Sequence, residues 1–514
     1  MKFDRADTLV TLLAPAEASA PAIGAPGQAW LTHAELAALC LQTGLYLNGI
    51  GFGRNDRIAM VVPNGPLMAT AFIAIGAYAT AAPLNPAYKD AEFEFYLTDL
   101  DAKALVIPEG FTSPARDVAQ RLGVAIVELV AQGNKAGDFT LHAPGMAPGP
   151  ARFPGPALAE DIALVLHTSG TTARPKIVPL TQANVTASAA NIAATLGLTP
   201  EDRCLNIMPL FHIHGLIAAV LSSLSAGGSV ACAPGLDGMK FFEWLKQIQP
   251  SWYTAVPSMH QGILKLAPRF KDIVAASTLR FIRSSSASLP PQVMTELEAA
   301  FGVPVIEAYG MTEASHQMTS NPLPPARHFA GSVGLAAGPE VAIMDEDGNL
   351  LAPDTIGEVV IRGRNVTSGY ESNPTANASA FTKGWFRTGD QGRLDAGGYL
   401  WLTGRLKEQI NRAGEKISPL EIDNVLMEHP AVQQALAFGV PDKDYGESVG
   451  AAIVLRDGHA ADAQSIRSFA AVHLANFKVP SKVVFLKEIP KGATGKLQRI
   501  GLAAKLGLGT NENV

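Results

Sequence analysis

The chain has 514 residues, of which 47% are hydrophobic and 17% are charged. This composition excludes a disordered chain and allows a large core, in roughly three domain-sized units or in one large and one small domain. The formal net charge of -6 argues against a sequence-independent grip on DNA or RNA, which needs a basic face. We therefore expect no nucleic-acid partner.

The cysteines and the two ends of the chain suggest a cytoplasmic protein. The three cysteines are scattered without metal-binding spacing, and an odd number suits a reducing compartment. The start lacks the basic and long apolar segments of a secretory signal, and the last residues are not a peroxisomal address. Two stretches without charged residues, 58–88 and 204–236, are interrupted by proline and glycine. We interpret them as buried helices and strands, and expect no membrane span.

In the first part of the chain, short β-branched runs alternate with longer alanine-rich runs. This alternation predicts mostly parallel α/β sheets with helices on their faces. The predicted strands are 56–64, 103–110, 124–130 and 161–170, and the predicted helices are 65–81 and 180–197.

The pattern changes twice further along the chain. From about residue 331, short strands with Asp-Gly turns predict a β-rich subdomain that reaches residue 405. Beyond it we expect a capped helix at 418–430, strands at 434–441 and 450–456, and a helix near 463–475, which form a small α+β domain. The predicted domains are therefore 1–405 at the N-terminal side and 406–514 at the C-terminal side.

The run His167-Thr-Ser-Gly-Thr-Thr-Ala-Arg-Pro-Lys176 follows a predicted strand, and we expect a helix to follow it. Closely spaced Ser, Thr and Gly offer small hydrogen-bond donors and a backbone that can close around phosphate oxygens. Lys176 adds a positive charge. The spacing of the glycines and the lysine differs from that of the GxxxxGK[ST] loop of P-loop nucleotidases.

This run resembles the phosphate loop of the adenylate-forming superfamily, which contains acyl-CoA synthetases, peptide-synthetase adenylation domains and luciferases. Five further matches follow in the family's order: MPLFHIHG (208–215), EAYGMTE (307–313), GWFRTGD (384–390), GRLKEQINRAGEKISPLEID (404–423) and PKGATGK (490–496). The chain departs from the family at Ala173 and Ile177, where the family usually has glycine. We expect a stiffer loop that still contacts phosphate.

The resemblance implies a large N-terminal domain, a small mobile C-terminal domain, and two half-reactions with ATP, Mg²⁺ and coenzyme A. A substrate carboxylate first attacks the α-phosphate of ATP, which yields an acyl-adenylate and pyrophosphate. The thiolate of coenzyme A then displaces AMP. In the first step an anion approaches a polyanion, so cations must be aimed at the transition state.

The resemblance also assigns roles to individual residues. Lys496 corresponds to the adenylation lysine, whose acetylation would remove the required charge, and Glu313 to the carboxylate that binds Mg²⁺. Thr312 and His212 complete the predicted catalytic residues. The predicted nucleotide-binding residues are Thr168, Ser169, Gly170, Thr171, Thr172, Lys176, Ser285, Ser286, Ala287, Glu307, Ala308, Tyr309, Gly310, Met311, Asp390 and Arg405.

Two further positions concern the second half-reaction. Lys407 corresponds to the hinge about which the family's small domain rotates, and a hinge residue absorbs a large backbone change. Gly414 would let the pantetheine arm of coenzyme A pass close to the backbone.

The segments that frame the family's acyl pocket are polar and cationic in this chain. The predicted substrate-binding residues are His212, His214, Arg283, Ser286 and His316. A dicarboxylate buries a second anion that needs a partner, and these side chains can supply it. Two alternatives stay open: Arg283 can pair with a protein carboxylate, and His316 can be a surface histidine.

The patterns HTSGTTxRPK, FHxHG, FIRSxSASL and MTEAxHxMxSNPLP are similar to those of oxalate–CoA ligases within the superfamily. The resemblance implies an acid–CoA ligase that converts oxalate to oxalyl-CoA. The alternatives are a malonyl-CoA or other short-chain acyl-CoA synthetase, a stand-alone adenylation domain that loads a carrier protein, and a luciferase-like oxygenase. A non-enzymatic scaffold is disfavoured because Lys496, Glu313 and Asp390 are all present. We expect a monomer or homodimer with small-molecule partners.

Overall fold

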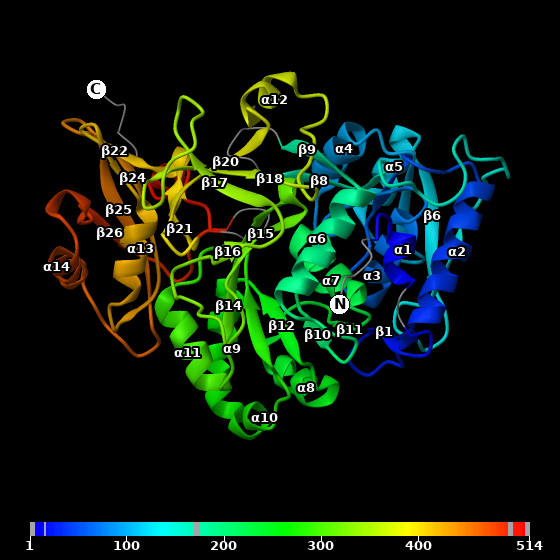
Figure 1. The fold of residues 1–514 in the computed structure, drawn as a ribbon, viewed down its shortest axis with the longest axis horizontal. Coiled ribbons are helices and arrows are strands. Elements are labelled where there is room, and N and C mark those ends of the chain that lie inside the picture. The colour runs from blue at the N-terminus through cyan, green and yellow to red at the C-terminus, as the bar shows by residue number, and fades with distance from the viewer. Residues whose placement is uncertain (1–5, 15–16, 169–174, 492–496, 509–514) are drawn as a thin grey trace.

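The computed structural model describes residues 6–14, 17–168, 175–491 and 497–508. The structure contains two large α/β sheets, a smaller β-rich sheet and a separate C-terminal sheet (Figure 1). The predicted fold class is confirmed by this arrangement. No helix in these described ranges is both long and apolar enough to cross a membrane.

The first large sheet contains the strands predicted near the N-terminus. Most of its neighbouring strands run parallel, and antiparallel pairs stand only at its two ends. In spatial order it contains β7 (Phe139–His142), β6 (Ala125–Ala131), β5 (Ala104–Pro108), β3 (Arg57–Met60), β4 (Thr80–Pro83), β8 (Ile162–Thr168) and β9 (Lys176–Thr181).

The second large sheet also has a parallel centre. The carboxyl ends of these parallel strands lie at one edge, where ligands of open α/β sheets usually bind. In spatial order it contains β16 (Leu335–Ala336), β15 (His316–Ser320), β14 (Val305–Met311), β13 (Phe281–Ser284), β12 (Trp252–Ala255), β10 (Arg203–Asn206), β11 (Ser229–Cys232), β1 (Pro21–Gly24) and β2 (Leu31–Thr32).

A layer of helices lies between the two large sheets and joins them into one core. Helix α3 (Pro66–Gly76) is buried around nearly its whole circumference, because it contacts strands of both sheets. Its neighbours in this layer include α6 (Gln182–Thr195), the π-helix η1 (His214–Leu221) and α7 (Ser222–Ser225). The two uncharged stretches of the sequence are thus buried helices and strands, as predicted.

Further helices cover the outer faces of the sheets (Figure 1). Apolar residues of α4 (Asp90–Asp99) and α5 (Pro114–Leu122) pack on the first sheet. The second sheet is covered by α8 (Gly238–Ile248), α9 (Pro257–Leu266) and α11 (Pro291–Phe301), next to α10 (Lys271–Ala275). Near the N-terminus lie α1 (Leu9–Leu13) and α2 (His33–Gly49).

The β-rich segment forms an antiparallel sheet of its own, as the sequence predicted. In spatial order it contains β17 (Glu340–Met344), β18 (Gly357–Arg362), β20 (Trp385–Leu394) and β19 (Phe381–Thr382), with β21 (Leu400–Arg405) paired to β20. Helix α12 (Pro374–Ala380) lies between β18 and β19 in the sequence.

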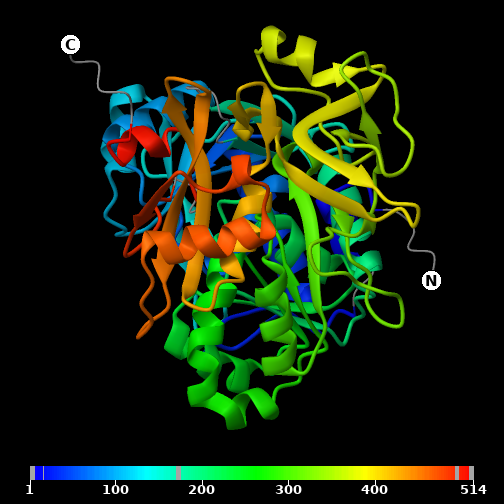
Figure 2. The same ribbon diagram turned by 90° about the vertical axis from the view of Figure 1, so that its left-hand side faces the viewer.

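The C-terminal sheet stands beside the β-rich sheet (Figure 2). Its strands are β23 (Glu415–Ile417), β22 (Ile410–Arg412), β25 (Gly446–Leu455) and β24 (Val432–Asp442), with β26 (Lys482–Phe485) paired to β25. Three helices accompany it: α13 (Pro419–Met427), α14 (Ala463–His473) and α15 (Leu502–Lys505). The helix predicted at 418–430 is present, but the Ser418 side chain does not cap it; its hydroxyl donates to the Thr403 carbonyl instead.

Candidate active site

The predicted phosphate loop joins two antiparallel strands. Thr168 at the end of β8 pairs with Lys176 at the start of β9. The expectation that a helix directly follows the loop is wrong, because β9 intervenes and α6 begins only at Gln182. β9 carries buried Ile177 and Val178, two β-branched residues that favour a strand. The predicted phosphate contacts Ser169, Gly170, Thr171 and Thr172 lie outside the described residues.

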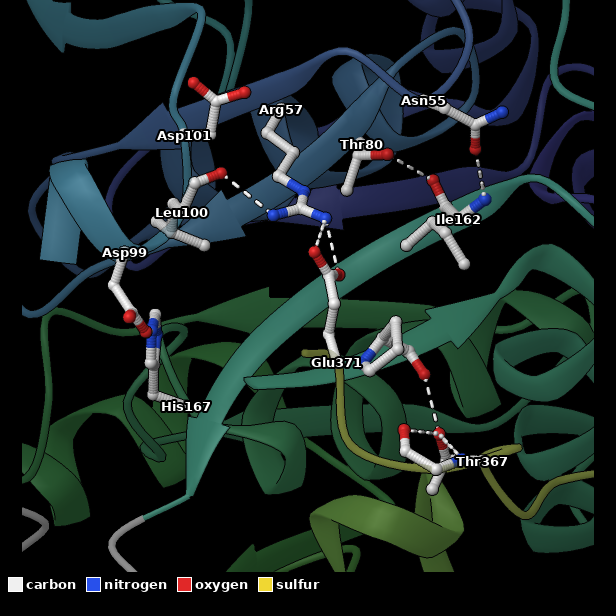
Figure 3. A network of polar contacts seen from close by, with 12 residues as sticks. Asn55, Arg57, Thr80, Asp99, Leu100, Asp101, Ile162, His167, Thr367 and Glu371 are labelled. Carbon is white, nitrogen blue, oxygen red and sulfur yellow. Dashed lines mark hydrogen bonds and ion pairs between the residues drawn. The ribbon is translucent and has the colours of Figure 1, made fainter. Parts of the chain in front are cut away.

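Two polar contacts hold the strands that flank this loop (Figure 3). His167 on β8 contacts Asp99 of α4, with 3.0 Å between Nε2 and the carboxylate. Burial lowers the pKa of His167, and the Asp99 carboxylate opposes this effect. Arg57 on β3 donates to both carboxylate oxygens of Glu371, and the Glu371 backbone N–H donates to the Ile177 carbonyl at 3.1 Å. These contacts link β8 to α4 and, through Glu371, link β9 to β3.

Glu313, the predicted magnesium ligand, lies in a short 3₁₀ turn, η3 (Thr312–Ala314), that also contains Thr312. Its carboxylate is 5% exposed and accepts a hydrogen bond from the Tyr370 hydroxyl at 2.8 Å. Burial raises the pKa of Glu313, whereas the positive charges of Lys176 and Arg405 lower it. The Lys176 ammonium lies 4.2 Å from the centre of the Tyr370 ring, a cation–π contact.

The lysine and the carboxylate therefore share one tyrosine. Burial lowers the pKa of Lys176, and the neighbouring Lys407 ammonium acts in the same direction. Glu313 opposes both effects. Glu313 and Lys407, which are far from Lys176 in the sequence, thus both act on it electrostatically.

Three of the predicted nucleotide-binding residues form a second polar group. Asp390 on β20 is paired across the sheet with Arg405 at the end of β21, and 3.0 Å separates the Arg405 Nε from the carboxylate. The Tyr309 hydroxyl donates to the other carboxylate oxygen. Burial and the Asp390 charge raise the pKa of Tyr309, and Asp390 also raises the pKa of Arg405. The structure thus brings together three predicted nucleotide-binding residues from separate strands.

The segment after β13 and strand β14 supply further predicted nucleotide-binding residues. The buried Ser285 hydroxyl donates to the Ala308 carbonyl at 2.8 Å, which joins the two strand ends. Ser286 has a φ of 75°, in the left-handed region, and Ala287 is exposed. The Glu307 carboxylate is buried and accepts from the Leu289 backbone N–H at 2.8 Å. Burial raises the pKa of Glu307 to about 8.

The turn between β14 and β15 is strained. Met311 pairs with His316 across this turn, and Gly310 lies so close to the His316 carbonyl oxygen that an added Cβ would stand 1.7 Å from it. Ser315 and His316 have φ values of 48° and 99°, which non-glycine residues rarely adopt. Such strain gathers at functional sites. Here it turns His316 toward Arg283.

Arg283 on β13 is completely buried, in contact with polar side chains. Its Nη1 lies 3.2 Å from the His316 Nε2 and 3.5 Å from the His214 Nε2, and its Nη2 donates to the Gln317 Oε1 at 3.3 Å. Its Nε has no hydrogen-bond partner within the described ranges. Among the described residues no carboxylate forms an ion pair with Arg283, so the alternative of a protein counterion is wrong for this part of the chain.

His316 contributes an acceptor in this arrangement, because a guanidinium can only donate hydrogen bonds and the His316 Nε2 faces it at 3.2 Å. The His214 Nε2 is closer to the Thr254 hydroxyl, at 2.6 Å, than to Arg283. The rings of His214 and His316 stack with centroids 4.9 Å apart. The Nδ1 of His214 lies 2.9 Å from the Ser286 Oγ, which brings four of the predicted substrate-binding residues into one group. Burial lowers the pKa of Arg283 to about 9, so it stays positively charged at neutral pH.

His212, the fifth predicted substrate-binding residue, makes a ring contact with its neighbour in the sequence. Its ring packs against Phe211, with 4.5 Å between the centroids, just before η1. It is half-buried, whereas His214 is 1% exposed.

The predicted hinge and coenzyme A positions lie in the chain that enters the C-terminal sheet. Lys407 is exposed in the short 3₁₀ turn η4 (Leu406–Glu408). Gly414 lies in the turn between β22 and β23 with a φ of 90° and open space beside it. Lys496 lies outside the described residues.

Sequence reasoning missed Tyr370, which links Glu313 to Lys176, and Gln317, which binds Arg283. It also missed Thr254, whose hydroxyl lies 2.6 Å from the His214 Nε2. The only available signals were that Gln317 adjoins His316 and that Tyr370 lies in the β-rich segment. No group of three or more His, Cys, Asp or Glu in the described ranges is arranged to hold a metal ion.

The comparisons with known proteins agree with these observations. A model of the AMP-binding enzyme family matches residues 14–371, and a model of the AMP-binding enzyme C-terminal domain matches residues 421–496. An oxalate–CoA ligase of Arabidopsis thaliana is 45% identical, covering 96% of this chain and 97% of its own. An oxalate–CoA ligase of Saccharomyces cerevisiae is 44% identical over 87% and 86% of the two chains.

A more distant relative and a solved structure are also similar to this chain over most of its length. A sulfoacetate–CoA ligase of Cupriavidus necator is 34% identical over 92% of each chain. The crystal structure of ATP-bound MatB from Rhodopseudomonas palustris has a TM-score of 0.87 at 29% identity and covers 97% of this chain and 98% of its own. The predicted superfamily and the predicted enzyme class, an AMP-forming acyl-CoA synthetase, are confirmed. This chain belongs to the family of AMP-binding enzymes.

Proposed function

We propose that this chain is an ATP-dependent ligase that joins oxalate to coenzyme A. The observation that carries the choice of acid is Arg283, a buried cation with no ion-paired carboxylate among the described residues. A buried charge without a partner is costly. The second carboxylate of a short dicarboxylate would supply that partner. Two relatives with 44–45% identity are named oxalate–CoA ligases, and a third acts on an acid with a second anionic group.

In the first half-reaction an oxalate oxygen attacks the α-phosphorus of ATP, and pyrophosphate leaves. The negatively charged partners repel one another, so the proposed task of Lys176 and Lys496 is to counter this charge. Asp390 would accept hydrogen bonds from the ribose hydroxyls, and Arg405, held by Asp390, would reach ribose or phosphate. The Ser285–Ala287 segment and the Glu307–Met311 strand would provide backbone around adenine, and Thr312 would contact the α-phosphate.

Glu313 fits a magnesium site that is completed by substrate phosphates. Mg²⁺ keeps several waters and is usually held by one or two carboxylates together with phosphates. Glu313 offers one buried carboxylate, and its Oε1 is oriented by Tyr370. When bound, the ion would neutralise phosphate charge.

In the second half-reaction the thiolate of coenzyme A attacks the acyl carbon, the thioester forms and AMP leaves. We propose that the C-terminal domain, about residues 406–514, rotates about Lys407 between the steps, which carries Lys496 away and brings Gly414 to the pantetheine arm. In the present arrangement Lys265–Asp457 and Arg456–Glu296 ion pairs join this domain to the helices of the second sheet. Such exposed pairs are worth little, which suits an interface that must separate.

The position of Arg283 also ranks the alternatives. Malonate carries the same two charges and remains the nearest competitor, whereas fatty acids would leave Arg283 unpaired. A cytoplasmic location and a monomer or homodimer remain predictions.

The test is pyrophosphate release with ATP, Mg²⁺ and coenzyme A, compared across oxalate, malonate, acetate and hexanoate. We expect kcat/KM for oxalate to exceed the others at least tenfold. A preference for acetate or hexanoate would reject oxalate as the substrate while keeping the ligase chemistry.

A further inference from the structure

Gln317 lies on β15 next to His316, and both residues are uncharged hydrogen-bond partners of the Arg283 guanidinium. Its side chain is completely buried. The Oε1 accepts from the Arg283 Nη2 at 3.3 Å. The Nε2 donates to the Ala337 carbonyl at 3.1 Å and to the Thr195 Oγ1 at 3.2 Å.

These contacts determine which way the amide faces. The Ala337 carbonyl can only accept a hydrogen bond, so the amide NH₂ must point to it. The Thr195 hydroxyl already donates to the Asn191 carbonyl at 2.7 Å, so its oxygen is left to accept from Gln317. The Gln317 oxygen is therefore directed at Arg283. A glutamate could not reproduce this arrangement in its ionised form, because it has no donor for the Ala337 carbonyl.

The position is thus built for an amide, although a carboxylate there would neutralise the buried guanidinium. The His316 and His214 rings that face Arg283 carry no negative charge, and the His316 Nε2 accepts a hydrogen bond from the guanidinium. Together with Gln317 they orient the guanidinium and leave its charge uncancelled.

We propose that Gln317 is a specificity-determining positioning residue: its neutral amide holds Arg283 in place and keeps the charge of Arg283 available for the second carboxylate of the substrate. This inference rests on the proposed oxalate ligase function and concerns the same pocket. The preference for a dicarboxylate depends on the difference between its affinity and the affinity of an acid without the second carboxylate. This difference is lost when a carboxylate of the protein itself pairs with Arg283.

The experiment compares oxalate with oxamate, its monoamide, in which a neutral amide replaces the second carboxylate. Gln317→Glu introduces an internal anion next to Arg283, and Gln317→Met removes the hydrogen bonds at similar length without adding charge. We expect Gln317→Glu to lower the oxalate-to-oxamate ratio of kcat/KM roughly 30-fold or more, the effect of a charge partner in a buried site. Gln317→Met should lower the ratio less, because the guanidinium loses only its orientation.

An Arg283→Met background provides the control. If Gln317 acts through Arg283, Gln317→Met, which adds no charge, should not change the ratio further in this background. Should Gln317→Glu fail to fold, as judged by thermal unfolding, the selective loss in Gln317→Met carries the test, and an unchanged ratio in that variant would overturn the inference. The inference would also be overturned if the wild-type ratio is ten or more and a folded Gln317→Glu variant has the same ratio. A wild-type ratio near one would overturn the proposed function, and this inference with it.

Discussion

Replacing Arg283 with methionine tests the pocket most severely, because it removes the buried charge and keeps much of the side-chain volume. Arg283 is 0% exposed. A unit charge pair about 4 Å apart interacts with roughly 4 kcal/mol at an effective dielectric constant of 20. Losing a buried charge partner costs about 2–5 kcal/mol in measured cases. Taking about 3 kcal/mol, kcat/KM for oxalate should fall roughly 100-fold.

The same substitution should have little selective effect on acetate, which has no second carboxylate. The assay is pyrophosphate release at saturating ATP and coenzyme A, with both acids on each protein. Equal losses for oxalate and acetate would refute the reasoning, since they would indicate a general defect in adenylation or folding.

Stability provides a second readout for Arg283→Met. Removing the guanidinium leaves the Gln317 Oε1 without its donor, which costs about 1–3 kcal/mol. It also removes a buried charge without an ion-pair partner in the described chain, and replacing such groups by apolar ones is often neutral or stabilising. We therefore expect the variant to fold with a Tm close to that of the wild type. A large fall in Tm would show that Arg283 is required for the fold.

Three further predictions concern neighbouring groups. Tyr370→Phe removes the hydroxyl that donates to Glu313 and keeps the ring beside Lys176. The Mg²⁺ dependence of ATP binding, measured by calorimetry, should therefore weaken several-fold. An unchanged dependence would contradict the role assigned to Tyr370. His316→Ala should lower kcat/KM for oxalate about tenfold or more with KM for ATP nearly constant; wild-type oxalate activity would place His316 outside the pocket. Burial raises the pKa of Glu307 from its ordinary value of 4.5 to about 8. Between these pH values the folded protein keeps a proton on Glu307 that the unfolded protein has lost. The free energy of unfolding should therefore fall as pH rises from about 5 to 8. Glu307→Gln should weaken this fall in chemical denaturation, and identical pH profiles would contradict burial as its cause.

Much of the fold was predictable because local patterns agreed with it. The apolar run that contains β3 and the helix α3 has no alternation of polar and apolar residues, and in the structure it is buried on nearly all sides. Strand β9 was missed because Pro179 interrupts its short apolar run and the preceding motif suggested a helix. The Ser418 hydroxyl bonds the Thr403 carbonyl instead of capping α13, a contact between segments that helix propensity alone does not describe.

The site was predictable only where a motif marked it. Tyr309, Asp390 and Arg405 were expected in one role, and strand pairing brings them together. The resemblance also marked Arg283 and His316, but their partner Gln317 is oriented by Thr195 and Ala337, which are distant in the sequence. The sequence pattern also did not indicate that His316 faces a guanidinium, which requires an acceptor.

The most direct test of the central claim is the wild-type kcat/KM for oxalate relative to oxamate, with the thioester product identified by mass spectrometry. The two acids have nearly the same size and differ by the second negative charge. If Arg283 binds the second carboxylate, oxalate should be preferred roughly 30-fold or more and oxalyl-CoA should be the product. Equal use of the two acids would contradict a pocket built around a buried, uncancelled charge.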